Sequence, residues 1–317
     1  LNHMKRIPII LDGDPGHDDA IGWVMAKGSG LFDIKAVTAV NGNCSVDKAA
    51  YNSQRICALI NLDVPIAKGQ KKPLYVESLD APVNVHGESG LDGPVLPEPA
   101  RDLEKETAVE VMIRVLEEAD EPVSIVATGP LTNVAALVLA RPDLKEKIKC
   151  FSIMGGGIMF GNWTPAAEFN ILVDPEAADI IFQCGVPVYM AGLDVTEKAL
   201  VTAPDVQRIK EIGNPVSEIV WKWLEFFYQF HKSIGYEGAP MHDACAVMVL
   251  IHPELFELKD MYVKVDLQGE FTRGQTVGDY YGVTGKKPNA TCLMNIDRQK
   301  FIDYMVEYIE AYTEGTL

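Results

Sequence analysis

The sequence has no apolar run long enough to cross a membrane, so we expect no transmembrane segment and no membrane partner. Its N-terminus also lacks the long apolar stretch of a secretory signal peptide, and we expect none. The six cysteines are scattered and form no Cys-x-x-Cys pair, which favours free thiols over disulfides or a zinc site. These absences together predict a cytoplasmic protein.

Positive charge is scarce: Lys and Arg number 28 against 45 Asp and Glu, for a formal net charge of −17. A field of that sign repels polyphosphates, so we expect no nucleic acid as a partner. A neutral small molecule carries no such penalty. The 317 residues, 48% of them hydrophobic, can form one large α/β domain or two small ones. Residues 1–3, before Met4, resemble the remnant of an expression vector, and we leave them out of the fold.

Strand-like and helix-like runs alternate from residue 8 to about residue 213. The expected strands include Ile7–Leu11, Ile34–Val40, Val123–Ala127, Phe151–Met154 and Val186–Ala191. Such alternation predicts an α/β protein with a mostly parallel sheet and helices on both faces. A later amphipathic helix, Pro215–His231, carries an apolar stripe that is typical of core packing. No internal repeat or linker is visible, so we predict a single domain over residues 4–317.

Four carboxylates, those of Asp12, Asp14, Asp18 and Asp19, crowd the turn between the first predicted strand and the helical run that follows it. In open α/β sheets ligands bind at this end of the strands. Helix capping explains one aspartate, but four like charges within eight positions repel one another unless a cation lies among them. Carboxylate oxygens suit Ca²⁺ or Mg²⁺, so we expect a metal or substrate site here.

Five further motifs place polar side chains in predicted turns and loops: Asn41-Gly42-Asn43, His86 to Gly93, Thr128 to Asn133, Gly161 to Asn170, and His242-Asp243. Each also has an ordinary explanation, such as a turn, a solvated loop or, for Asp243, an N-cap. If the chain is extended from Glu168 to Asn170, these two side chains share a face and suit a vicinal polyol. His231 and His252 lie outside the motifs, and we assign them to structural or surface positions.

The first stretch, Asp12-Gly13-Asp14-Pro15-Gly16-His17-Asp18-Asp19, resembles the signature of the inosine-uridine-preferring nucleoside hydrolases. The five other motifs follow in the order of that family, so the resemblance covers nearly the whole chain after Met4. It implies a Rossmann-like nucleoside hydrolase fold and a homodimer or homotetramer. It also implies calcium-dependent hydrolysis of the N-glycosidic bond of ribonucleosides, which gives ribose and free base.

The resemblance assigns roles to individual positions. It implies that Ca²⁺ is bound by Asp14, Asp19, the backbone carbonyl of Thr128, and Asp243. It implies that the substrate is bound by Asp18, Asn43, Met154, Asn162, Glu168 and Asn170. Asp14 is the implied general base that activates water, while His242 and His86 are the implied groups beside the leaving base.

Base preference depends on fewer residues. His86 and His242 together resemble the pyrimidine-preferring or broad members, whereas purine-specific members stack the base between tryptophans, and here only Trp163 lies in a motif. We therefore expect uridine and cytidine as substrates, with inosine or a modified nucleoside as the alternative, and residues 228–237 as part of the base pocket. A non-catalytic nucleoside- or ribose-binding protein is the alternative from another class. Asp12-x-Asp14 also resembles the nucleophile loop of haloacid-dehalogenase-like phosphatases, which need neither Asp18-Asp19 nor the polyol motif.

Overall fold

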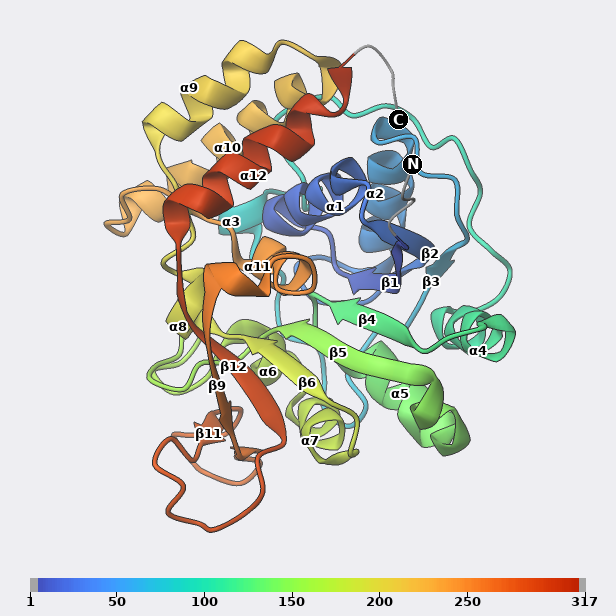
Figure 1. Ribbon diagram of the computed structural model, residues 1–317, viewed down its shortest axis with the longest axis vertical. Helices are drawn as coiled ribbons and strands as arrows, with labels where there is room; N and C mark the ends of the chain where they lie inside the picture. The colour runs from blue at the N-terminus through green and yellow to red at the C-terminus, as the bar shows by residue number, and fades with distance from the viewer. Residues whose placement is uncertain (1–4, 314–317) are drawn as a thin grey trace.

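The central sheet of the protein has eight strands, all parallel except the edge strand β9 (Figure 1). In spatial order they are β3 (Ile66–Lys68), β2 (Phe32–Ala39), β1 (Ile7–Gly13), β4 (Val123–Ala127), β5 (Ile148–Met154), β6 (Val188–Ala191), β12 (Ala290–Ile296) and β9 (Phe256–Met261). The computed structural model describes residues 5–313, so the suspected vector remnant at 1–3 lies outside the described residues. The predicted, mostly parallel sheet is confirmed.

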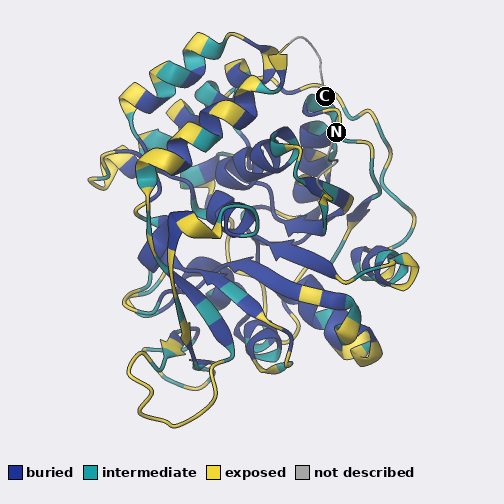
Figure 2. Ribbon diagram, viewed as in Figure 1, coloured by how far each residue is buried: buried dark blue, intermediate teal, exposed yellow. Residues whose placement is uncertain are grey.

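Helices cover both faces of this sheet, as the alternation predicts. One face packs against α1 (His17–Ser29), α2 (Val46–Leu59), α10 (Pro215–Ser233), α11 (His242–Met248) and α12 (Arg298–Glu310). The other packs against α4 (Ala108–Glu118), α5 (Thr132–Ala140) and α7 (Pro175–Gln183). Alternate side chains of β1 serve the two cores, Ile9 and Leu11 on one side and Ile10 on the other. Figure 2 shows the strands buried between these layers.

The path of the chain makes one edge of the sheet suitable for a ligand. After β1 the chain builds β2 and β3 on one side, and then crosses to build β4 on the other side of β1. The carboxyl ends of β1 and β4 therefore diverge at a topological switch point, where open α/β sheets form their ligand crevice. The four aspartates lie where β1 passes into α1, with Asp12 at the end of β1, Asp14 in the turn, and Asp18 and Asp19 at the start of α1; the residue after β4 is Thr128.

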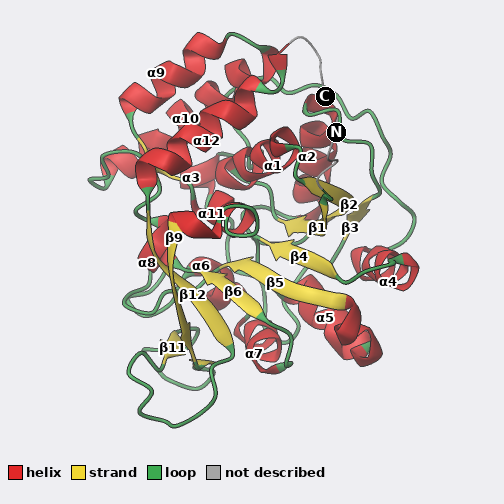
Figure 3. Cartoon of the chain, in the orientation of Figure 1, coloured by secondary structure: helices red, strands yellow, loops and turns green. Residues whose placement is uncertain are grey.

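The remaining elements are short (Figure 3). They are α3 (Val83–His86), η1 (Pro142–Lys147), α6 (Phe169–Val173), α8 (Leu193–Thr196), β7 (Leu200–Val201), α9 (Ala203–Ile212), β8 (Ala239–Pro240), η2 (Pro253–Leu255), β10 (Val263–Val265) and β11 (Thr276–Gly278). The sequence pattern missed the edge strand β9 and the helices α6, α8 and α9. Within residues 5–313 no helix has the length and hydropathy to span a membrane. All six cysteines are unpaired, as predicted.

Candidate active site

Three of the predicted carboxylates meet at the switch point. Single oxygens of Asp18, Asp19 and Asp243 lie within 4.8 Å of one another, and all three residues are buried. Asp18 and Asp19 come from the first turn of α1, where the helix dipole favours negative charge, and Asp243 comes from the first turn of α11. The N-cap of α11 is Met241, so capping does not explain Asp243.

Asp14 lies beside this trio and is fully buried. Its Oδ2 accepts a hydrogen bond of 2.6 Å from the backbone N–H of Asn43, while its Oδ1 has no partner among the described residues. Gly42 and Gly129 leave the room for this carboxylate, because a Cβ on either would lie 2.0 Å or 2.8 Å from one of its oxygens. The predicted Asn-Gly-Asn motif therefore supports Asp14 through its backbone.

Burial raises the pKa of every carboxyl group in this cluster. The pKa of Asp18 rises to about 7, because burial and then the neighbouring Asp19 charge disfavour ionisation. The pKa values of Asp14 and Asp243 rise well above the usual range for the same two kinds of reason. Asp12 is also raised to about 7 by burial, although Thr38 and Asn133 each donate a hydrogen bond of 2.7 Å to its Oδ1.

The cluster fits a hard divalent cation. Within the described part of the chain, neither Lys nor Arg lines the adjoining cavity, and no salt bridge reaches these carboxylates. Buried, unpaired carboxylates at this density are unfavourable unless a cation neutralises them. All candidate donors are oxygens, which suits Ca²⁺ or Mg²⁺ better than a softer metal.

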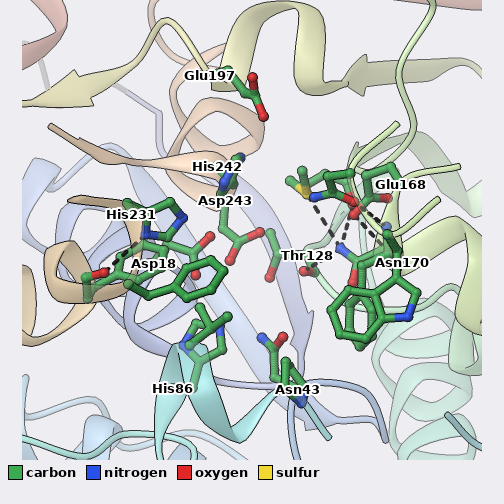
Figure 4. A pocket seen from close by; sticks show the side chains of 18 of the residues that line it. Asp18, Asn43, His86, Thr128, Glu168, Asn170, Glu197, His231, His242 and Asp243 are labelled. Carbon is green, nitrogen blue, oxygen red and sulfur yellow. Dashed lines mark hydrogen bonds between the residues drawn. The ribbon is translucent and has the colours of Figure 1, made fainter. Parts of the chain in front are cut away.

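A cavity of about 860 Å³, including its mouth, opens over the carboxylates (Figure 4). Its lining includes all of the predicted substrate residues, both predicted histidines and two of the predicted metal ligands: Asp18, Asn43, Met154, Asn162, Glu168, Asn170, His86, His242, Thr128 and Asp243. Asp14 and Asp19 do not line it and lie behind the others. Residues from six separate motifs, spread over more than 200 positions, therefore converge on one site.

One wall of the cavity is polar and belongs to the ends of β4 and β5. Asn170 Nδ2 donates to the backbone carbonyls of Thr128 at 3.1 Å and Met154 at 2.9 Å. Glu168 accepts backbone hydrogen bonds from Gly156, Asn170 and Ile171, and burial raises its pKa to about 7. The chain is not extended from Glu168 to Asn170, because Glu168 is the N-cap of α6 and Asn170 lies in that helix. Capping brings both side chains to the same wall instead.

The opposite wall is aromatic and comes mainly from α10. Phe227, Phe230 and His231 line it, together with His86 from α3. No motif indicated His231, and the structure places it, buried, at the cavity. Its Nδ1–H donates to the carbonyl of Phe227 at 3.0 Å, so in the neutral ring Nε2 carries the lone pair. The expectation that residues 228–237 help to form the pocket is confirmed, since Phe230, His231, Ile234 and Tyr236 all line it.

His242 stands between the two walls. Its Nδ1 lies 2.7 Å from the hydroxyl of Thr196 on α8, and burial lowers its pKa to about 3. Burial also lowers the pKa of His86 well below 6.5. Both imidazoles are therefore neutral near pH 7, and each offers one N–H and one lone pair. Glu197, which no motif indicated, lines the cavity nearby and accepts a hydrogen bond of 2.6 Å from the Tyr236 hydroxyl.

Comparison with known proteins agrees with this geometry. Residues 9–303 match the family described as inosine-uridine preferring nucleoside hydrolase. A pyrimidine-specific ribonucleoside hydrolase RihA from Enterobacter sp. (strain 638) is 52% identical over 310 residues, which cover 97% of this chain and 99% of that protein. RihA from Escherichia coli O127:H6 (strain E2348/69 / EPEC) is 52% identical over 309 residues, 96% of this chain and 99% of the relative. The solved structure of a purine-preferring ribonucleoside hydrolase from Gardnerella vaginalis has a TM-score of 0.90 at 28% identity, and covers 96% of this chain and 98% of that one.

Proposed function

This chain belongs to the inosine-uridine preferring nucleoside hydrolases, and from that premise we propose that it hydrolyses pyrimidine ribonucleosides, uridine and cytidine, to ribose and free base. The observation that carries the proposal is the convergence of a buried carboxylate cluster, a polar wall and a histidine-rich aromatic wall on one cavity. Two relatives that are 52% identical to this chain are named pyrimidine-specific, and this supports the pyrimidine preference.

We propose Asp14, Asp19, Asp243 and the carbonyl of Thr128 as the ligands of a calcium ion. The unpartnered Oδ1 of Asp14 and the trio of Asp18, Asp19 and Asp243 support this donor set. The Thr128 carbonyl accepts from Asn170 and keeps a second lone pair for a cation. When bound, such an ion supplies positive charge that offsets the carboxylates and lowers the pKa of a water beside it.

The residues of the chain divide the reaction between them. The Asp14 carboxylate accepts the proton of the attacking water, the water oxygen forms a bond to C1′, and the bond from C1′ to the base nitrogen breaks. Asp18 and the polar wall of Glu168 and Asn170 hold the ribose hydroxyls. The sugar becomes cationic in the transition state, as in glycoside hydrolysis, and the surrounding carboxylates stabilise it. The base departs with the electron pair of the broken bond into the histidine side of the cavity, where we place His242 and His86, and takes up one proton from solvent. Asp14 returns the proton of the attacking water to solvent, so the net reaction consumes one water.

The proposal is tested by measuring ribose release from uridine, cytidine, inosine, adenosine and 2′-deoxyuridine in the presence of Ca²⁺. We expect release from uridine and cytidine to be fastest, and release from 2′-deoxyuridine to be slower by a factor of roughly 100 because the 2′-hydroxyl contact is lost. Faster release from inosine would replace the pyrimidine assignment by a purine one. Stoichiometric binding of uridine without any ribose release would identify a nucleoside-binding protein instead.

His231 provides a second test of the base pocket. His231→Phe keeps a ring against Phe227 and Phe230, whose centroids lie 4.4 Å and 5.2 Å from that of His231, but it removes the Nε2 lone pair. We expect kcat/KM for uridine to fall by about tenfold, the equivalent of one hydrogen bond, with little change in thermal stability. The measurement is steady-state kinetics beside a thermal melt. Unchanged kinetics would return His231 to a purely structural role.

We further propose that the protein works in the cytoplasm as a homodimer or homotetramer, with a small nucleoside as its only substrate partner. The six unpaired cysteines support a reducing compartment. The formal net charge of −17 argues against nucleic acid.

A further inference from the structure

The loop that carries His86 is built around the side chain of Asp92. The Asp92 carboxylate accepts backbone hydrogen bonds of 3.0 Å from Glu88 and from Ser89. Gly87 has a φ of +79°, and a Cβ there would lie 2.1 Å from an Asp92 oxygen, so only glycine fits this turn. These contacts fix the backbone of Asp92, and with it the direction of its carbonyl group.

The Asp92 carbonyl holds His17, the residue within the acidic motif to which the proposed reaction gives no role. His17 Nε2 lies 2.7 Å from the carbonyl oxygen of Asp92, and His17 Nδ1 lies 3.0 Å from His86 Nδ1. The planes of the two imidazoles are inclined by only 12°, and both residues are buried. Phe227 packs on both rings, with centroid distances of 5.8 Å to His17 and 5.4 Å to His86.

Counting protons along these side-chain contacts leaves one arrangement of neutral rings in which no two lone pairs face each other. The Asp92 carbonyl oxygen can only accept a hydrogen bond, so His17 carries its proton on Nε2. The Nδ1 of a neutral His17 then carries the lone pair. His86 Nδ1 must then carry a proton and donate it to His17 Nδ1, since otherwise two lone pairs would face each other at 3.0 Å. A neutral His86 that is protonated on Nδ1 has a lone pair on Nε2.

One contact favours the opposite tautomer of His86. The backbone N–H of His17 also points at His86 Nδ1, at a longer distance of 3.3 Å. This N–H belongs to the first turn of α1, where amide groups have no partner within the helix. If it controlled the tautomer, His86 Nδ1 would be a lone pair and Nε2 would carry the proton.

We propose that His17 is a positioning residue of the base pocket, which fixes His86 in the tautomer whose Nε2 accepts a hydrogen bond from an N–H group of the bound base. This inference rests on the proposed nucleoside hydrolysis. His86 lines the cavity, and no hydrogen bond within residues 5–313 engages its Nε2. The chemistry that it recognises is a nucleobase with a ring or amino N–H at that wall, as in uracil or cytosine.

The tautomer can be measured without any substrate. In protein labelled with ¹⁵N-histidine, the nitrogen shifts distinguish a protonated ring nitrogen from a lone-pair nitrogen, and His86→Gln identifies the His86 signals. We expect Nε2 of His86 to be the lone-pair nitrogen in the unaltered protein, and to become partly protonated in His17→Phe. A protonated Nε2 in the unaltered protein, or no change in His17→Phe, would overturn the proposal even if the protein proved to be no hydrolase.

Two substitutions at position 17 separate tautomer control from packing. His17→Phe keeps the ring against Phe226 and Phe227 but offers no acceptor, whereas His17→Asn loses the ring and keeps an acceptor oxygen near the place of Nδ1. We expect kcat/KM for uridine to fall about tenfold in His17→Phe and about threefold or less in His17→Asn. The reverse order would mean that His17 only packs. His252→Phe, at a histidine that instead packs on Tyr304, is the control for the loss of an imidazole.

Discussion

Replacing Asp14 by Asn is expected to lower kcat for uridine by roughly 10³-fold, while KM changes by about threefold or less. The carboxamide oxygen can still accept the 2.6 Å hydrogen bond from the Asn43 amide, so the turn keeps its shape. What disappears is the negative charge of the carboxylate, and with it the base that takes the proton of the attacking water, because a carboxamide does not accept that proton. Steady-state kinetics, with bound calcium measured in the same samples, checks the result.

Asp12→Asn is the matched control for this substitution. Asp12 is as buried as Asp14 and also has one oxygen, Oδ2, without a partner among the described residues, but it lies in β1 and its Oδ1 accepts hydrogen bonds from the side chains of Thr38 and Asn133. We expect it to reduce kcat far less than Asp14→Asn does. Equal losses of kcat in the two variants would show that the net charge of this region matters, rather than a general base at Asp14. Near-normal turnover in Asp14→Asn would also contradict the assignment of Asp14 as the general base.

The sequence was sufficient to predict the acidic half of the site. Asp12, Asp14, Asp18 and Asp19 are close in the chain, so one strand–turn–helix unit brings them together without long-range information. Position after the second strand also indicated Asn43, because the carboxyl ends of neighbouring parallel strands share one edge of the sheet, whereas Thr128 was indicated only by the family resemblance. The same reasoning predicted the sheet and its two helical layers.

The aromatic wall of the cavity depends on how α10 packs over the site, which a local sequence pattern does not indicate. His231 follows Phe227 by four residues and Trp223 by eight, so all three share one face of α10. That stripe predicted core packing, and Trp223 does lie in the core, but the last two turns of the helix extend over the cavity. A histidine on an otherwise apolar face was the available signal. The short helix α6 was missed because its five residues are too few to show a period.

Removing the divalent cation is expected to abolish ribose release and to make the protein less stable as the pH rises. In the cation-free protein the pKa of Asp18 is about 7, and those of Asp14, Asp19 and Asp243 are also raised, chiefly by burial. The native state therefore holds protons between about pH 4 and pH 7 that the unfolded chain has already released. Since the native state binds more protons in this window, the free energy of unfolding falls as pH increases through it.

Calcium should reverse that dependence, because a cation favours the ionised carboxylates. At 100 times its dissociation constant a ligand adds about 2.7 kcal/mol to the free energy of unfolding, which for a chain of this size raises Tm by about 4 °C. Thermal melts at pH 5 and pH 8, with chelator and with added Ca²⁺, measure both effects. We expect the gain from calcium to be larger at pH 8. A gain that is independent of pH would mean that calcium binds elsewhere.

The identity of the ion follows from which cation restores turnover after chelation. Three or four protein oxygens, two ribose hydroxyls and one water would make a shell of about seven, which suits calcium better than the strict octahedron of magnesium. We therefore expect Ca²⁺ to restore ribose release fully and an equal concentration of Mg²⁺ to restore much less. Asp243→Ala should weaken this response, because it removes one of the three carboxylates that lie within 4.8 Å of each other. Full restoration by Mg²⁺ alone would contradict the calcium assignment while leaving the carboxylate site intact.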